Sequence, residues 1–278
     1  MALYKTQAVV IGRRVLGESD RLVQFYSREF GKVSGVAKAA RRPRSRFGSA
    51  LELFTLGELI FFDTGRSDLV RVDHFDIVRP FVGVREHLER LGQGAWAAEF
   101  VARLTADRDP HPALFALLVR SLRALESNSR PPRVAACFAL RAVDLLGHRP
   151  RIDRCVACGR PYPFPGAALD VTAGGLVCAG CGAGPDAMPV SGALAGTLKR
   201  LRELRWEEGL ALPLAPALDG ELSLLLEGLV ARLMGRSPLT SRYLVQTRRG
   251  LLRVAAPAAP HASLSPHPSL SPRGRASW

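Results

Sequence analysis

Four of the five cysteines in this sequence occur as two closely spaced pairs. Cys155 and Cys158 form one Cys-x-x-Cys pair, and nineteen residues separate it from the second pair, Cys178 and Cys181. A gap of two residues lets one tight turn direct both sulfurs at a single ion, and four thiolates fill the tetrahedral shell of Zn²⁺ without leaving a position for water. The pattern therefore predicts a structural zinc site. Two disulfides or two redox-active pairs are the alternatives, but neither accounts for the short separation between the pairs.

A second pattern with chemical consequences is a dense run of positive charge between Gly31 and Phe54. Six cations and no carboxylate lie between Glu29 and Glu52. Cations so close together repel one another unless an external anion neutralises them, and a phosphate backbone is such an anion; the alternative is a solvated loop that only keeps the protein soluble. Phe47 follows the arginines among small and polar neighbours, so we expect a base to stack on it. The predicted nucleic-acid contacts are Lys32, Lys38, Arg41, Arg42, Arg44, Arg46 and Phe47.

No other group of residues in the sequence predicts catalysis. Gly31-Lys32 comes nearest to a phosphate-binding loop, but Val33 follows where Ser or Thr is required. Acidic pairs such as Glu207-Glu208 are isolated and suit a solvated surface, so they do not assemble a two-metal site. The fifth cysteine, Cys137, lies in an apolar helical stretch, where a thiol behaves as a small buried hydrophobic side chain. The sequence therefore favours a protein without enzymatic activity.

The composition is that of a folded, basic protein. The 278 residues are 47% hydrophobic and 23% charged, a balance typical of globular chains and not of disordered ones. An excess of 39 Lys and Arg over 25 Asp and Glu gives a net charge of +14, which favours nucleic acid or an anionic membrane surface as partner. No apolar run reaches the roughly 20 residues that cross a bilayer, and the N-terminal segment lacks the pattern of a signal peptide. We therefore expect a cytoplasmic location.

The elements that must position the basic run are short β-strands separated by turn residues. The predicted strands cover residues 5–13, 20–27, 31–39, 53–63 and 69–79. Five short strands with one long connection after the third favour a small closed barrel, because closure removes the exposed edges of a sheet. We therefore predict an OB-like barrel over residues 1–80, a fold whose strand face and loops bind single strands. Tyr26 and Phe30 are expected to belong to its core.

Helical periodicity follows the strands, with apolar residues recurring every three or four positions. The predicted helices begin at residue 85 and continue at 112–126, 132–146, 191–205 and 219–234. The zinc module, residues 155–184, thus interrupts an α-helical domain made of residues 81–154 and 185–253, and the chain as a whole is an α+β multidomain protein. Residues 254–278 are rich in Ala, Pro, Ser and His, which predicts a disordered tail.

Arginines line the polar faces of the predicted second and third helices, where they could accept an acidic partner beside the leucines. Ordinarily such residues only keep a helical bundle soluble. The candidate partner-binding residues are Arg120, Arg123, Arg130, Arg133 and Arg141.

Three stretches of the sequence, residues 16–54, 140–159 and 235–244, resemble the bacterial RecO family of recombination mediators. The resemblance implies an OB barrel, a helical domain, a zinc-binding insert and a non-enzymatic role in recombinational repair at the nucleoid. It also implies binding to single- and double-stranded DNA, annealing of complementary strands, pairing with RecR, binding of the acidic tail of single-stranded DNA-binding protein, and help in loading RecA. The family's basic barrel surface corresponds to Lys32 through Arg46, and its cysteine ligands to the two pairs. The tail after Val254 departs from the family pattern.

These features are compatible with three functions. The leading one is a DNA-binding factor that neutralises two strands at once, so that complementary bases can meet. The second is an adaptor that docks proteins through its zinc module and helices, with incidental DNA affinity. The third is a nuclease. Strand annealing measured without nucleotide or magnesium distinguishes the three, because the first anneals, the second does little and the third needs the metal.

Overall fold

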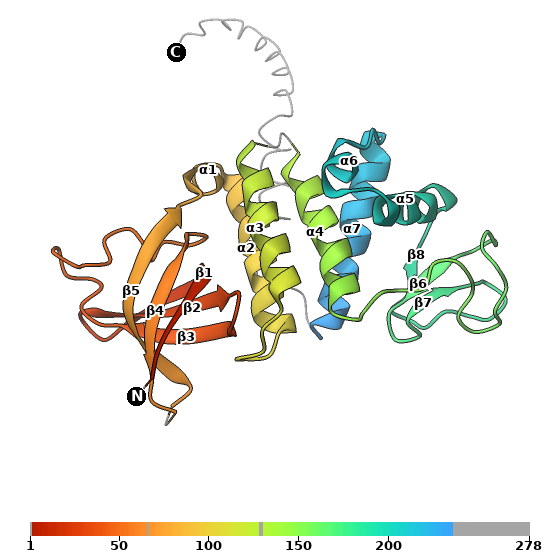
Figure 1. Ribbon diagram of the computed structural model, residues 1–278. Helices are drawn as coiled ribbons and strands as arrows, with labels where there is room; N and C mark the ends of the chain where they lie inside the picture. The colour runs from red at the N-terminus through yellow and green to blue at the C-terminus, as the bar shows by residue number, and fades with distance from the viewer. Residues whose placement is uncertain (1, 66, 128–129, 236–278) are drawn as a thin grey trace, which may run out of the picture.

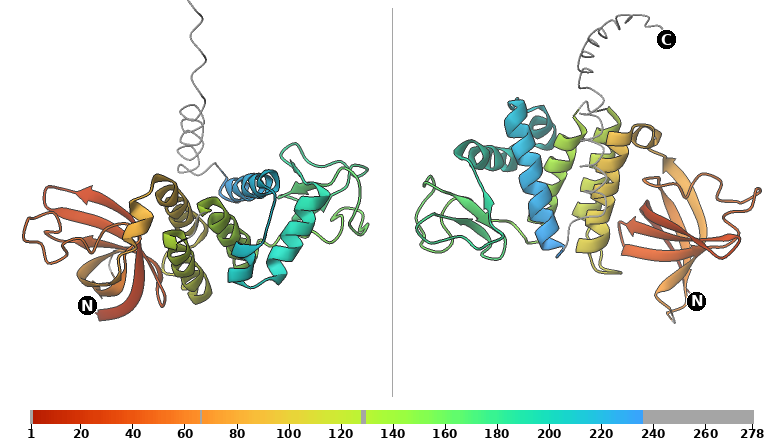
Figure 2. Two further views of the ribbon diagram at one scale, coloured as in Figure 1. Left: turned by 90° about the horizontal axis from the view of Figure 1, so that it is seen from above. Right: turned by 180° about the vertical axis from the view of Figure 1, so that it is seen from behind.

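The computed structural model describes residues 2–65, 67–127 and 130–235, and the predicted tail at 254–278 lies outside these ranges. Three parts follow one another along an elongated molecule (Figure 1). A β-barrel occupies one end, helices form the centre, and a small module with the paired cysteines occupies the other end, an order that the views in Figure 2 repeat.

Five strands form the N-terminal sheet, as predicted. They are β1 (Ala2–Leu16), β2 (Asp20–Ser27), β3 (Gly31–Ala37), β4 (Leu56–Asp63) and β5 (Leu69–Arg79). The sheet closes in the order β1-β2-β3-β5-β4, and β4 pairs back onto β1. Its pairs are antiparallel except for β3 with β5, which are parallel. This closure leaves the connection from β3 to β4, which carries the basic run, at one end of the barrel.

The alternation of buried and half-buried residues along the strands explains how the barrel core is filled. In β3, residues 31, 33, 35 and 37 are buried and those between them are half-buried, so one set of side chains fills the interior. Gly35 has to be small, because a Cβ there would lie 2.7 Å from a methyl group of Val72 and 2.8 Å from one of Val70. Phe25, Phe61 and Phe75 are buried in the same cluster.

The helical part is built around one central helix. The helices are α1 (Val82–Arg85), α2 (Leu88–Leu104), α3 (Pro112–Ser127), α4 (Pro131–Leu145), α5 (Gly192–Glu203), α6 (Trp206–Ala211) and α7 (Pro216–Leu233). Helix α4 contacts α2, α3, α5, α6 and α7, and it is buried along most of its length, Cys137 included. The helices expected from periodicity are present. The short helices α1 and α6 were not expected as separate elements, since neither is long enough to show a period.

The barrel and the bundle share a packed interface. Tyr26 is buried on the outside of β2, where its ring lies 6.5 Å from that of Phe115 in α3. Gly31 lies against the backbone of the loop after α2: a Cβ there would be 2.0 Å from the carbonyl oxygen of Asp109. Tyr26 therefore belongs to the interface core rather than to the barrel interior, and the two parts pack directly against each other.

The cysteine module follows α4. Its strands β6 (Ala168–Asp170), β7 (Gly175–Val177) and β8 (Met188–Pro189) form a small sheet in the order β7-β6-β8. The segment leading into it is held by backbone hydrogen bonds of Arg151 with Gly174 and Leu176. Among the described helices, none combines the length and apolarity required to cross a membrane.

Candidate metal centre and nucleic-acid interface

The four paired cysteines converge at one point of the module. Their sulfurs all lie within 4.8 Å of one another, and the sulfurs of Cys158 and Cys178 are 3.9 Å apart. Tetrahedral zinc with bonds of about 2.3 Å requires sulfurs about 3.8 Å apart, so the cluster has the size of a four-thiolate shell. All four are free thiols, and a separation of 3.9 Å is far beyond a disulfide bond. The disulfide alternative is therefore wrong for this structure.

Local backbone geometry places the sulfurs. In the first pair the N–H of Gly159 donates to the carbonyl of Cys155 at 2.9 Å, and in the second the N–H of Cys181 donates to the carbonyl of Cys178 at 3.1 Å. Gly159 has a φ of 76°, and the residue after the second pair has a φ of 72°. These left-handed angles favour glycine, which explains why a glycine follows each pair. Each pair thus forms a tight turn that directs its two sulfurs toward the same point.

The electrostatics of the cluster suit a cation. Backbone N–H groups, that of Cys158 first and that of Cys178 next, lower the pKa of Cys155 to about 6. The neighbouring thiols, those of Cys158 and Cys178 foremost, raise the pKa of Cys181 to about 12. Four thiolates at these distances repel one another unless a positive ion lies between them. The donor set therefore fits a soft divalent metal, and these four residues could hold one.

The basic run forms a loop fastened over one end of the barrel. Ala39 donates its N–H to Asp20 at 2.8 Å, and the Nη1 of Arg41 donates to the carbonyl of Glu18 at 2.8 Å. The N–H of Ala39 and the hydroxyl of Ser19 lower the pKa of the Asp20 carboxyl, and the charges of Lys38 and Arg42 add to the effect. Lys38, Arg41, Arg42, Arg44 and Arg46 are exposed. The loop is thus an ordered basic surface.

Two predicted DNA contacts are not part of that surface. Lys32 is only 11% exposed, donates from Nζ to the carbonyls of Ala102 and Thr105 at 2.7 and 2.9 Å, and pairs with Asp107 at 3.3 Å. It fastens the barrel to the bundle instead of meeting phosphate. Phe47 is 3% exposed and packs in the barrel core, so a base cannot stack on its ring. Both assignments were wrong, because a run of charges in the sequence does not indicate which side chains point into the fold and which face solvent.

The burial of Phe47 has a signal in the sequence. Residues 47, 50, 51 and 54 follow a helical spacing of apolar side chains, and all four are buried in the structure. Phe47, Ala50 and Leu51 pack in the barrel core, whereas Phe54 packs in the cluster shared with the helices. The exposed arginines lie on the outer side of the loop. The guanidinium of Arg46 lies 5.2 Å from the centroid of the Phe47 ring and 3.6 Å from Asp73. Arg46 therefore helps to hold the loop in place, although its side chain is also exposed.

The strand face beside this loop adds cations that sequence reasoning missed. A shallow pocket of about 300 Å³ lies on the outside of β1, β2 and β3, lined in part by Arg13, Arg14 and Gln24. Arg13 pairs with Glu52, whereas Arg14 is exposed. On β5, Arg71 is paired with Val36 in the ladder next to this face. These residues are dispersed in sequence, so only strand pairing brings them together.

The five helical arginines do not form one surface. Arg133 is fully buried: its Nε donates to Asp219 at 2.6 Å and its Nη1 to the carbonyl of Leu212 at 2.9 Å. Its predicted place on a solvated face was wrong, because α7 covers that side of α4. Arg141 is half-buried and donates to the carbonyl of Leu204 at 3.0 Å. Arg120 and Arg123 are exposed on α3.

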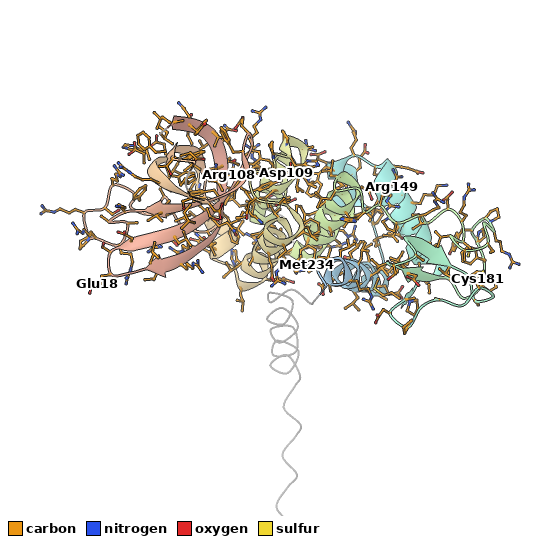
Figure 3. All side chains as sticks on the ribbon, turned by 90° about the horizontal axis from the view of Figure 1, so that it is seen from below. Glu18, Arg108, Asp109, Arg149, Cys181 and Met234 are labelled. Carbon is orange, nitrogen blue, oxygen red and sulfur yellow. The ribbon has the colours of Figure 1, made fainter. Side chains whose placement is uncertain are left out.

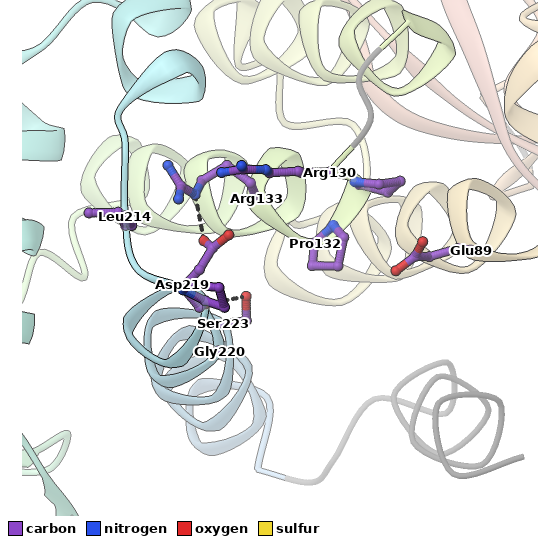
Figure 4. Close-up of a pocket in the computed structure, with 10 residues that line it drawn as sticks. Glu89, Arg130, Pro132, Arg133, Leu214, Asp219, Gly220 and Ser223 are labelled. Atoms are coloured by element: carbon purple, nitrogen blue, oxygen red, sulfur yellow. Dashed lines mark hydrogen bonds and ion pairs between the residues drawn. The ribbon is translucent and has the colours of Figure 1, made fainter. Parts of the chain in front are cut away.

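A pocket of about 400 Å³ lies where α4 and α7 begin (Figure 4). Arg130 and Arg133 line it together with Leu214 and three prolines, and Asp219 accepts from Arg133 beside them. The site combines apolar walls with guanidinium groups, and Glu89 also contributes to its lining. Of the five arginines, these two therefore share one concave site.

Comparison with known proteins agrees with this architecture. Residues 1–81 match the family profile "Recombination protein O N terminal", and residues 85–243 match "Recombination protein O C terminal". The DNA repair protein RecO of Anaeromyxobacter sp. (strain K) is 37% identical over 86% of this chain and 95% of its own length. The RecO of Rubrobacter xylanophilus is 40% identical over 79% and 86%, and that of Myxococcus xanthus 35% over 88% and 98%. This chain belongs to the RecO family of DNA repair proteins.

Proposed function

We propose that this chain is a recombination mediator that binds DNA through its N-terminal barrel and anneals complementary single strands without breaking or making bonds. The closed order of five strands, with β3 parallel to β5, supports an OB-like barrel, a fold that binds oligonucleotides on its strand face and loops. The observation that carries the proposal is the basic loop: Lys38, Arg41, Arg42 and Arg44 are exposed on a segment fastened to the barrel.

Physical reasoning connects this surface to annealing. Two complementary strands are polyanions, and bringing them together costs more electrostatic work than binding one of them. A fixed array of cations lowers that cost by replacing condensed counterions. Because hydrogen bonds to Asp20 and Glu18 hold the loop, strand binding would order its exposed side chains but not its backbone, which lowers the entropic cost of binding. Arg14 and Arg71 would extend the path of a strand across the barrel face.

We propose that zinc occupies the cysteine cluster as a structural ion. When bound, it would be held by Cys155, Cys158, Cys178 and Cys181, and it would stabilise the fold of the module by joining the two Cys-x-x-Cys turns. Cys155 and Cys178 are buried, whereas Cys158 and Cys181 are exposed at the surface of the module. No substrate position is left in such a shell, so the ion would be structural and not catalytic.

We further propose that the acidic tail of single-stranded DNA-binding protein binds the pocket between the beginnings of α4 and α7, and that the chain works with RecR to help load RecA. The pocket has apolar walls for the end of the tail, and Arg130 lies exposed beside them for its acidic residues. Binding of a tail peptide should weaken in Arg130→Ala. Loss of binding in Arg120→Ala/Arg123→Ala instead would move the site to the outer face of α3.

The test of the main activity is annealing of complementary fluorescent strands by purified protein without nucleotide or magnesium. A mediator anneals under these conditions, an adaptor with incidental DNA affinity does little, and a nuclease needs the metal. Protein that binds both strands yet leaves the annealing rate at its spontaneous value would refute the proposal.

A further inference from the structure

A further basic site lies away from the barrel, between the helical bundle and the cysteine module. A pocket of about 520 Å³ is bounded by the linker after α4, by Tyr162 of the module and by α5. In Figure 3, Arg149 of this linker lies toward the end that carries Cys181, far from Glu18 at the opposite end. The pocket is therefore separate from the basic loop, which is bonded to Glu18.

The lining of the pocket is rich in cations. Four of its residues are positively charged, namely Arg149, Arg151, Lys199 and Arg202, and two are acidic, Asp153 and Glu203. The Oδ2 of Asp153 also accepts from the Nε of Arg154, which is not part of the lining, at 3.0 Å. The net charge of the lining is thus positive, and it favours an anion.

One of these cations is built into the wall. Arg202 has a side chain only 8% exposed; its Nη1 donates to the carbonyl of Pro150 at 3.1 Å and its Nη2 to Asp144 at 3.0 Å. Its Nε is buried and has no acceptor. Burial lowers the pKa of this guanidinium, so an additional negative charge nearby would stabilise its charged form. Asp144 alone does not offset its burial, since it also lies 3.9 Å from Arg149.

The remaining walls suit a flat, partly apolar group. Ala195 and Gly196 line the α5 side, and a Cβ at Gly196 would meet no other atom within 4 Å, so this side is open. Ile152 and the half-buried Tyr162 line the facing side. Cations next to an aromatic ring and small side chains are the combination by which proteins hold a nucleotide, with phosphate on the cations and the base against the ring.

We propose that this pocket binds the terminal phosphate of a nucleic-acid strand. Linker, module and α5 enclose it on three sides, which suits a strand end better than a strand that must enter and leave. A terminal phosphomonoester also carries a charge of about −1.5 to −2 at neutral pH, more than an internal phosphodiester. The module sets the position of Arg151, because both its N–H and its carbonyl bond to the β7 region.

The experiment measures binding of strands of about ten nucleotides, labelled at one end and carrying either a phosphate or a hydroxyl at the other. We expect the phosphorylated strand to bind about tenfold tighter, the effect of one charge-assisted hydrogen bond. Arg151→Gln/Lys199→Gln should abolish this preference. Arg120→Gln/Arg200→Gln is the matched control, since it removes the same charge from exposed positions outside the pocket. Equal thermal transitions would show that all variants fold.

Two outcomes would overturn the proposal: equal affinity of wild-type protein for both strands, or a preference that survives in the double variant. The proposal would also be overturned if the same substitutions abolished binding of an acidic peptide while the wild-type protein showed no preference for a phosphorylated end. That result would assign the pocket to a protein partner. Failure of the barrel proposal is distinguishable, because substitutions in the basic loop change the affinity for both strands together and leave their ratio unchanged.

Discussion

Replacing Lys38, Arg42 and Arg44 with alanine tests the contribution to DNA affinity that we propose for the basic loop. These three side chains are exposed, and among the described residues none of them makes a hydrogen bond or an ion pair, so the substitutions should leave the fold intact. Arg41 is excluded because it holds the loop to the carbonyl of Glu18, and Arg46 because it lies over Phe47 and near Asp73.

The expected magnitude comes from counterion release. Each phosphate contact on a single strand contributes a slope of about −0.7 to the plot of log affinity against log salt concentration. Three contacts therefore contribute about −2, and the triple variant should lose about that much slope. Annealing should fall further than single-strand binding, because two polyanions need more neutralisation than one.

The assay is a fluorescence anisotropy titration at several salt concentrations, accompanied by annealing of complementary strands. Arg120→Ala/Arg123→Ala/Arg200→Ala is the matched control, since it removes the same charge from exposed helical positions. A triple loop variant that folds normally and keeps both the wild-type slope and the annealing rate would show that the loop is only a solvated surface. A control variant with an equal loss of slope would show that net charge, not position, provides the affinity.

Three further predictions concern stability. Phe47→Ala should lower the free energy of unfolding by about 3–5 kcal/mol, because the ring is buried in the barrel core; unchanged melting with weaker single-strand binding would contradict this. Metal analysis should find one zinc per chain, and Cys178→Ser should lower both zinc content and melting temperature more than it lowers DNA affinity of the folded fraction; five freely titrating thiols in the wild type would refute the site. Arg133→Met should destabilise by about 3–5 kcal/mol, since it leaves the Asp219 carboxylate without its partner, and Asp219→Asn should recover part of the loss; denaturant unfolding of the single and double variants decides.

The strands and helices could largely be predicted from the sequence. Alternation in β3 and the three-to-four spacing of leucines in α3 reflect one-sided burial, and one-sided burial is a local property of the chain. The convergence of the four cysteines was also predictable, because two Cys-x-x-Cys turns at this separation are typical of a single four-thiolate metal site. Helix α6 was missed, since six residues do not show a period.

The roles of individual charges were decided by tertiary structure. Lys32, Arg133 and Arg44 look alike in sequence, yet the first fastens the barrel to the bundle, the second is buried beneath α7, and the third is exposed. A cation long enough to reach several partners has no local preference among carbonyl, carboxylate and water, so its partner depends on which distant segment packs beside it. The sequence by itself determined that this chain carries a basic barrel loop and a four-cysteine cluster. Only the folded structure decided which cations remain exposed, because burial and pairing are set by contacts between residues far apart in the chain.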